Sequence, residues 1–135
     1  MAKIKLDNVT LLALGSTQIK ENIAALQFSM RGIDFGAVKF ISHEQPAEVP
    51  RGIQYEKFND FENISYKEFS YYCIYKLIEH VETEFMLMIH PDGFVINPDS
   101  WTDEFMEWDY IGAPWPLMDT AFIDPFGNHQ RVGNG

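Results

Sequence analysis

A histidine and an aspartate two residues apart are the side chains best suited to chemistry in this 135-residue chain. The apolar run Phe85–Ile89 has the length of a buried strand, and it stops at His90-Pro91-Asp92-Gly93. In an open α/β sheet, ligands bind just past the carboxyl ends of strands. Side chains two residues apart on extended chain point the same way, so His90 and Asp92 are candidate metal- or phosphate-binding residues. Carboxylates suit Mg²⁺ or Mn²⁺, and Mn²⁺ tolerates an imidazole better than Mg²⁺ does.

The same four residues also have a purely structural interpretation. The sequence Pro91-Asp92-Gly93 is typical of a hairpin-like turn, in which Asp92 bonds its own backbone and His90 lies on the surface. The sequence by itself leaves both interpretations open.

Two later segments carry residues that could contact a ligand. In Asp109–Pro116, rings such as Tyr110 and Trp115 are surfaces on which a sugar or nucleobase stacks, although a hydrophobic cluster under a loop has the same composition. In Val132–Gly135, Gly133 beside Asn134 lets the backbone approach a ligand closely. A flexible terminus is the alternative there.

The elements that must position these residues alternate between strands and helices. Asn8–Gly15 and Gly36–Ser42 are almost wholly apolar and predict strands buried on both faces. Between them, Ser16 or Thr17 is expected to cap a helix with apolar residues at helical spacing, which makes a parallel β-α-β unit.

The second half of the chain repeats this alternation. The sequence predicts a short third strand, a helix that begins at a Ser65–Glu68 capping box, the strand that leads to His90, and a further short helix. Tyr72, Ile74 and Ile78 are expected to widen the apolar face of the first of these helices. Alternating strands and helices predict an α/β fold: a mostly parallel sheet with helices on both faces. The expected ranges are Ile53–Phe58, a helix from Ser65 to near Thr83, Phe85–Ile89 and Ser100–Trp108.

Charge and composition exclude some classes of protein. The formal net charge is −10, and from Leu77 to Gln130 there are eleven acidic residues and no Lys or Arg. A nucleic-acid binder needs the opposite, a basic surface that faces phosphates. The acidic half is either a solvated surface or part of a site that recruits a divalent cation.

No apolar run approaches the length of a transmembrane segment, and the first thirty residues lack a signal-peptide pattern. The single cysteine, Cys73, permits no internal disulfide and fits a reducing compartment. We therefore expect a cytoplasmic protein.

Three segments together resemble a family of uncharacterised domains grouped with the GT-A type glycosyltransferases. They are His90–Val95, Trp108–Trp115, which contains the specific run Asp-Tyr-Ile-Gly-Ala-Pro-Trp, and the closing Val132–Gly135. The resemblance implies one Rossmann-like sheet that binds a nucleotide-sugar donor and transfers the sugar to a saccharide or other acceptor.

The resemblance also implies roles for individual residues. In GT-A enzymes an Asp-x-Asp motif after the central strand holds a divalent metal and the donor diphosphate. Here that position is His90 and Asp92, a departure that leaves Asp92 as the better ligand. Asp109 is a candidate acceptor-side carboxylate, so Asp92 and Asp109 are the expected catalytic residues. The expected substrate-binding residues are Leu14, Gly15 and Ser16 for the nucleotide, Ser42 and His43 for the base or ribose, and Tyr110, Trp115, Gly133 and Asn134.

In the family, the Val-Gly-Asn-Gly segment leads into a further strand and an acceptor-side part. We therefore expect residues 1–135 to form one donor-binding domain that is incomplete at its carboxyl end. Such a half would expose a sheet edge, which favours a homo-oligomer. The rival hypothesis is a non-catalytic α/β domain that binds protein or carbohydrate through the aromatic Tyr110–Trp115 patch.

Overall fold

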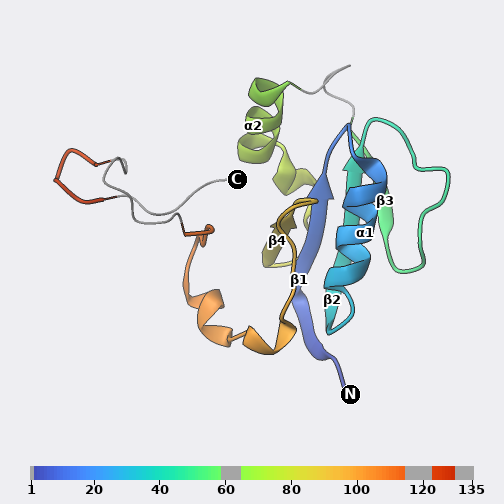
Figure 1. The fold of residues 1–135 in the computed structure, drawn as a ribbon, viewed down its shortest axis with the longest axis horizontal. Helices are drawn as coiled ribbons and strands as arrows, with labels where there is room; N and C mark the ends of the chain where they lie inside the picture. The colour runs from blue at the N-terminus through green and yellow to red at the C-terminus, as the bar shows by residue number, and fades with distance from the viewer. Residues whose placement is uncertain (1, 59–64, 115–122, 130–135) are drawn as a thin grey trace. The chain divides into compact units, whose positions relative to one another are not determined.

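The computed structural model describes residues 2–58, 65–114 and 123–129. The chain divides into two compact units, Met1–Ser100 and Trp101–Gly135. The first unit contains the sheet and both α-helices (Figure 1). Within the described ranges, no helix is long and apolar enough to cross a membrane.

A four-stranded sheet forms the centre of the first unit, in the order β3-β2-β1-β4. Every neighbouring pair is parallel, so the predicted α/β class is confirmed. The helices and strands are β1 (Ile4–Leu14), α1 (Ile19–Ser29), β2 (Ile33–Ser42), β3 (Gln54–Lys57), α2 (Tyr66–Tyr75) and β4 (Phe85–Ile89).

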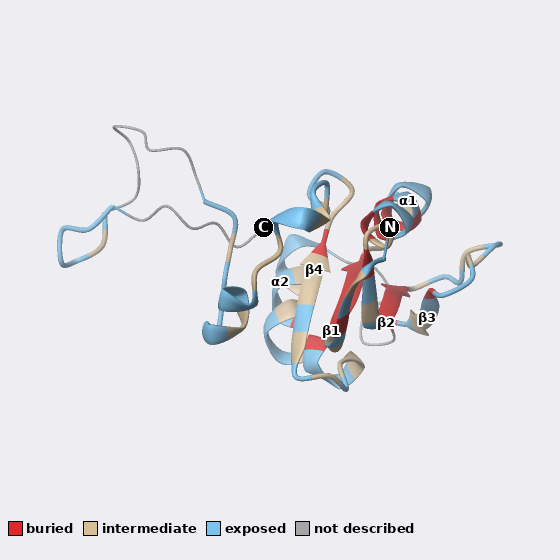
Figure 2. Ribbon diagram, turned by 90° about the horizontal axis from the view of Figure 1, so that it is seen from below, coloured by how far each residue is buried: buried red, intermediate tan, exposed pale blue. Residues whose placement is uncertain are grey.

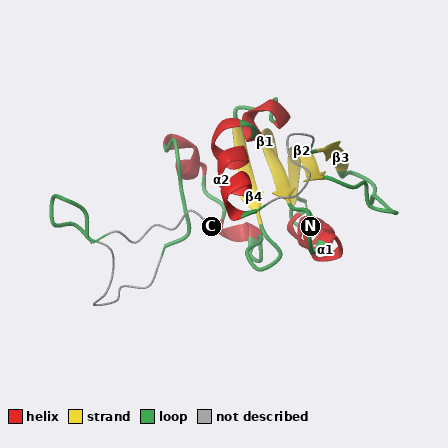
Figure 3. Ribbon diagram, turned by 90° about the horizontal axis from the view of Figure 1, so that it is seen from above, coloured by secondary structure: helices red, strands yellow, loops and turns green. Residues whose placement is uncertain are grey.

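The two α-helices cover opposite faces of this sheet (Figure 3). Alternate residues of β1 point to opposite sides, so Leu11 packs in one core cluster with Leu26 of α1, and Leu12 packs in the other with Tyr72 of α2. Figure 2 shows the buried residues concentrated on β1 and β2. Burial on both faces explains why β1 is almost wholly apolar from Val9 to Leu14. The strand begins earlier than predicted, at Ile4, and its first half is more exposed and carries Lys5 and Asp7.

The start of α1 differs from the predicted cap. Gln18, not Ser16 or Thr17, is the N-cap residue; its φ of 52° is left-handed, and its side chain makes no capping bond. A side chain in the first turn of α1 holds the preceding loop instead. Asn22 Nδ2 donates to the carbonyls of Thr17 (3.3 Å) and Gln18 (3.0 Å).

The second helix begins at the predicted Ser65 cap, whose Oγ accepts from the Glu68 backbone N–H at 3.4 Å. The return bond of the predicted capping box does not form, and Glu68 Oε2 has no hydrogen-bond partner among the described residues. The helix ends at Tyr75, well before Thr83, and the chain continues as a 3₁₀ helix over Leu77–His80. Leu77 is buried there, whereas Ile74 and Ile78 are 71% and 76% exposed, so these two isoleucines do not belong to the core-facing side. The helix is therefore shorter than its apolar spacing predicts.

The second unit contains little regular structure in its described part. A 3₁₀ helix covers Asp103–Glu107, inside the range where a helix was predicted, and the Thr102 hydroxyl accepts from the Glu104 N–H. Further on, the Asp124 carboxylate accepts from the backbone N–H groups of Phe126 and Asn128, each at 2.9 Å.

Candidate ligand site at the carboxyl edge of the sheet

The strand order creates a switch point between β1 and β4. After β1 the chain builds β2 and β3 on one side, and it then returns to place β4 on the other side of β1. Ala13 pairs with Ile89, so the loops that begin at Leu14 and His90 leave the sheet side by side. In open α/β sheets this crevice, outside the carboxyl ends of the strands, is where ligands bind.

The loop after β4 is a tight turn. His90 N donates to Gly93 O at 2.9 Å, and Gly93 N donates to His90 O at 3.1 Å. The turn interpretation is therefore correct for the backbone, and the extended-chain argument for a shared side-chain direction does not apply. The His90 ring is half-buried, with its centroid 6.1 Å from that of Phe69, whereas Asp92 is exposed. In the part of the chain that the structure describes, no three His, Cys, Asp or Glu side chains form a metal-binding group.

The loop after β1 is held close to the sheet and to α1. Leu14 is buried in the core on the α2 side, so only its backbone is available to a ligand. Gly15 N donates to Ile41 O at 3.0 Å, and a Cβ at Gly15 would lie 3.1 Å from Asn22 Nδ2. Ser16 is half-buried. The buried Asn22 Oδ1 has no hydrogen-bond partner among the described residues.

The end of β2 contributes a second buried polar atom. Ser42 is 1% exposed, and its hydroxyl has no hydrogen-bond partner in the described ranges. Its carbonyl accepts from the Phe58 N–H at 2.9 Å and from the Tyr55 hydroxyl at 3.0 Å. Burial, and then the charge of Glu44, raise the pKa of Tyr55, which keeps this hydroxyl a donor. The next ring, His43, is half-buried and packs edge-on against Phe58, with centroids 4.5 Å apart.

The predicted site residues therefore fall into three groups. Those at the ends of β1, β2 and β4 lie along one edge of the first unit: Leu14, Gly15, Ser16, Ser42, His43, His90 and Asp92. Asp109 and Tyr110 belong to the second unit, and both are exposed. Trp115, Gly133 and Asn134 lie outside the described residues.

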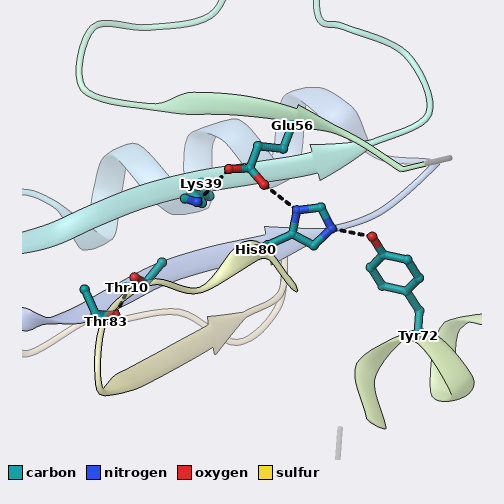
Figure 4. A network of polar contacts seen from close by, with 6 residues as sticks. All are labelled: Thr10, Lys39, Glu56, Tyr72, His80 and Thr83. Carbon is teal, nitrogen blue, oxygen red and sulfur yellow. Dashed lines mark hydrogen bonds and ion pairs between the residues drawn. The ribbon is translucent and has the colours of Figure 1, made fainter. Parts of the chain in front are cut away.

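Sequence reasoning missed a partly buried polar network on the α2 face, the Lys39 network, which consists of Lys39, Glu56, His80 and Tyr72 (Figure 4). Lys39 Nζ donates to Glu56 Oε1 at 2.6 Å. Glu56 Oε2 bonds to His80 Nδ1, and His80 Nε2 shares a hydrogen bond with the Tyr72 hydroxyl. The available signal was Lys39 itself, a charged residue inside an apolar strand.

The electrostatics of this network keep Glu56 ionised. Burial raises the pKa of Glu56, but the hydrogen bonds and charges of Lys39 and His80 outweigh it and hold this pKa below its ordinary value. The Lys39 side chain is 6% exposed, so its charge depends on Glu56 for a partner. With Thr83, Lys39 and Glu56 also line a hollow on this side of the sheet.

The fold and this edge define the class: a parallel α/β domain with polar residues gathered at its switch point. Residues 53–135 match the family described as "protein of unknown function (DUF5672)", and the chain belongs to this family. The match spans β3, α2, β4 and the His90–Asp92 turn. No curated protein and no solved structure matches the chain.

Proposed function

We propose that this chain binds a nucleoside diphosphate sugar at the carboxyl edge between β1 and β4, as the donor-binding part of a GT-A type glycosyltransferase. The observation that carries the proposal is the strand order β3-β2-β1-β4, which puts the Leu14–Ser16 loop and the His90–Asp92 turn at one switch point. These are the two segments in which the resemblance predicts contacts with the nucleotide and the diphosphate.

A divalent cation at this edge would take few ligands from the protein itself. Mg²⁺ in such sites is commonly held by one or two carboxylates together with substrate phosphates. The exposed Asp92 carboxylate would serve as the protein ligand. An imidazole ligand from His90, as the resemblance implies, would make Mn²⁺ the better match. When bound, the cation would offset the charge of the departing diphosphate. Asp109, the proposed acceptor-side carboxylate, lies in the second unit.

Three buried side-chain atoms in the described ranges lack a hydrogen-bond partner, and the third, Glu68 Oε2, belongs to α2. The other two support a ligand rich in hydroxyl groups. Buried polar atoms nearly always have hydrogen-bond partners, so Asn22 Oδ1 and Ser42 Oγ are exceptions that need an explanation. Asn22 belongs to α1 and bonds to the end of the loop that follows β1. Ser42 is the last residue of β2. A ribose can both donate to an amide oxygen and accept from a serine hydroxyl. A nucleotide would therefore supply what both atoms lack.

Asp92→Ala tests the proposal directly. Calorimetric titration with UDP and GDP, with and without Mn²⁺, is expected to show Mn²⁺-dependent binding of one nucleotide. Asp92→Ala is expected to weaken that binding strongly, because the cation that joins the diphosphate to the protein would lose its carboxylate ligand. Asp99→Ala is the matched control, since it removes another exposed carboxylate from the same unit.

Two results would reject donor binding at this edge. One is the absence of measurable heat with either nucleotide at millimolar concentration. The other is nucleotide binding that Asp92→Ala and Asp99→Ala leave equally unchanged, because the diphosphate would then bind elsewhere.

The exposed rings of the second unit favour a second candidate function. Trp108 and Tyr110 are 66% and 65% exposed, and Ile111 is also exposed. Exposed apolar groups of this kind mark surfaces that bind protein or carbohydrate. A non-catalytic interaction domain would leave Asp92→Ala without effect, whereas Trp115→Ala or Tyr110→Ala would abolish capture on a glycan array or by a partner protein.

A further inference from the structure

The outer side of α2 carries exposed apolar side chains (Figure 2). Ile74, Tyr75 and Ile78 are 71%, 63% and 76% exposed. Tyr71 is 45% exposed, and its ring centroid lies 5.0 Å from that of Tyr75. These residues have the spacing i, i+3, i+4 and i+7, so they share one side of α2 and of the 3₁₀ helix that continues it. We call these four residues the α2 stripe.

The α2 stripe is separate from the side of the helix that packs on the sheet. Tyr72 and Leu77 are buried in the core cluster on this face of the sheet, and Phe69 and Cys73 pack against that cluster. The helix is therefore apolar on two sides, whereas a surface helix of a single domain is expected to be polar on its outer side. Contiguous exposed apolar groups mark a surface that binds another protein.

The charges near the two ends of the α2 stripe have opposite signs. At the amino end Lys67 is exposed, whereas the neighbouring Glu68 is partly buried. At the other end Glu79 and Glu82 are both exposed, and only Lys76, which pairs with Glu79 at 3.1 Å, offsets them. Two such helices attract each other at both ends when they run antiparallel, and a parallel pair would bring like charges together. A two-fold axis makes both end contacts equivalent.

We propose that the α2 stripe is the contact surface of a homodimer, in which α2 of one copy packs antiparallel against α2 of a second copy. Burial of the apolar side chains supplies the affinity, and the charges at the ends set the orientation. Two stripes with their flanking residues would bury on the order of 1,000 Å² in total, near the lower limit of a specific interface, so the dimer is expected to be weak. This surface differs from the sheet edge through which the sequence predicts self-association.

Sedimentation equilibrium of the full chain measures this association. The wild type is expected to show a monomer–dimer equilibrium with a dissociation constant in the micromolar range. Ile74→Glu is expected to weaken the association at least about tenfold, because each copy would bury an unpaired carboxylate in the contact. Ile96→Glu is the matched control, since Ile96 is 74% exposed and lies after β4, outside α2. This control is expected to associate like the wild type.

Two charge variants test the antiparallel orientation. Lys67→Glu brings acidic groups together at both ends of the contact and is expected to weaken the association about threefold to tenfold. Adding Glu82→Lys to this variant restores opposite charges and is expected to recover most of the wild-type affinity. In a parallel pair, Lys67→Glu would only exchange one like-charge contact for another.

The outcomes decide the inference without any nucleotide. A wild type that stays monomeric at millimolar concentration would overturn it. A dimer that Ile74→Glu and Ile96→Glu leave equally intact would also overturn it, because the copies would then meet through another surface, such as the edge of the sheet. Association that Lys67→Glu does not change would reject the antiparallel pair. Ile78→Glu, at the other end of the stripe, gives the same decision if circular dichroism shows that Ile74→Glu does not fold.

Discussion

The Glu56 carboxylate bonds to two side chains that are distant from it in the sequence. One of its oxygens holds the ammonium of Lys39 from β2, and the other holds the imidazole of His80 from the 3₁₀ helix before β4. An unpaired Lys39 in this buried position would be costly, because a buried charge that loses its partner destabilises the fold strongly. Glu56 therefore stabilises the fold only while it is ionised.

The pH dependence of stability follows from this. The folded state lowers the pKa of Glu56 below its ordinary value of 4.5, so its stabilisation is present above pH 4.5 and is lost as the pH falls through the lower folded pKa. Glu56→Gln removes that contribution. The difference in unfolding free energy between wild type and Glu56→Gln is expected to shrink between about pH 6 and about pH 3, as measured by urea denaturation.

The control for this experiment is Glu79→Gln, which breaks the exposed ion pair with Lys76. Exposed pairs contribute about 0–1 kcal/mol, so this variant is expected to follow the wild type closely at every pH. A difference between wild type and Glu56→Gln that stays constant across the acid range would contradict the ionised role of Glu56.

At the scale of elements, the junction of β1 and β2 depends on one glycine. The register shifts between Leu6 and Thr10 of β1, and this irregularity brings the Asp7 carbonyl against β2. A Cβ at Gly36 would lie 2.1 Å from the Asp7 oxygen and 2.8 Å from its carbonyl carbon. Backbone atoms cannot move aside as a flexible side chain can.

Gly36→Ala is therefore expected to destabilise the protein by about 2 kcal/mol or more, the cost of overpacking a filled site. Gly93→Ala is the matched control, because a Cβ at Gly93 would meet nothing within 4 Å. Urea unfolding of the two variants beside the wild type measures both effects. Equal stabilities of Gly36→Ala and Gly93→Ala would show that the junction tolerates the added methyl group.

The elements also show which features the sequence could predict. The carboxyl halves of β1 and β2 are buried, and each leaves an apolar run that predicts a strand within a few residues. β4 lies at the edge of the sheet with only Ile89 buried, but its five residues are all apolar and also predict a strand. The ends of the helices were less predictable, because individual side-chain hydrogen bonds accompany them that the apolar spacing does not show. Asn22 holds the loop before α1, and His80 bonds to residues of β3 and α2.

The candidate site was predictable to a similar extent. Its residues were found because each follows an apolar strand, but the switch point depends on the order of strands in the sheet, which the apolar runs do not reveal. The turn at His90 was less certain, because it depends on the bonds between His90 and Gly93. The Lys39 network could not be found from spacing, since Glu56 lies 17 positions from Lys39 and 24 from His80.

At the scale of the molecule, the described core belongs wholly to the first unit. The two core clusters draw their buried residues from the segment between Leu11 and Ile89. Within the described ranges, no buried hydrophobic residue follows Ile89. The described buried core of the sheet thus lies within Met1–Ser100.

A chain of residues 1–100 is therefore expected to fold alone, with a single cooperative urea transition and an unfolding free energy within about 1 kcal/mol of that of the full chain. Far-ultraviolet circular dichroism and urea titration measure this. Loss of the cooperative transition in the shorter chain would show that residues beyond Ser100 are needed to complete the core.

The central position of β1 also affects how the chain folds during synthesis. Its partner β2 ends at Ser42, but its other partner, β4, ends only at Ile89. At a translation rate of about 5–20 residues per second, roughly 2–9 s pass between the two. Throughout that interval, one side of β1 has unsatisfied amide and carbonyl groups beside an apolar surface. During that interval we expect the nascent polypeptide to be prone to edge-to-edge association, until β4 covers this side of β1.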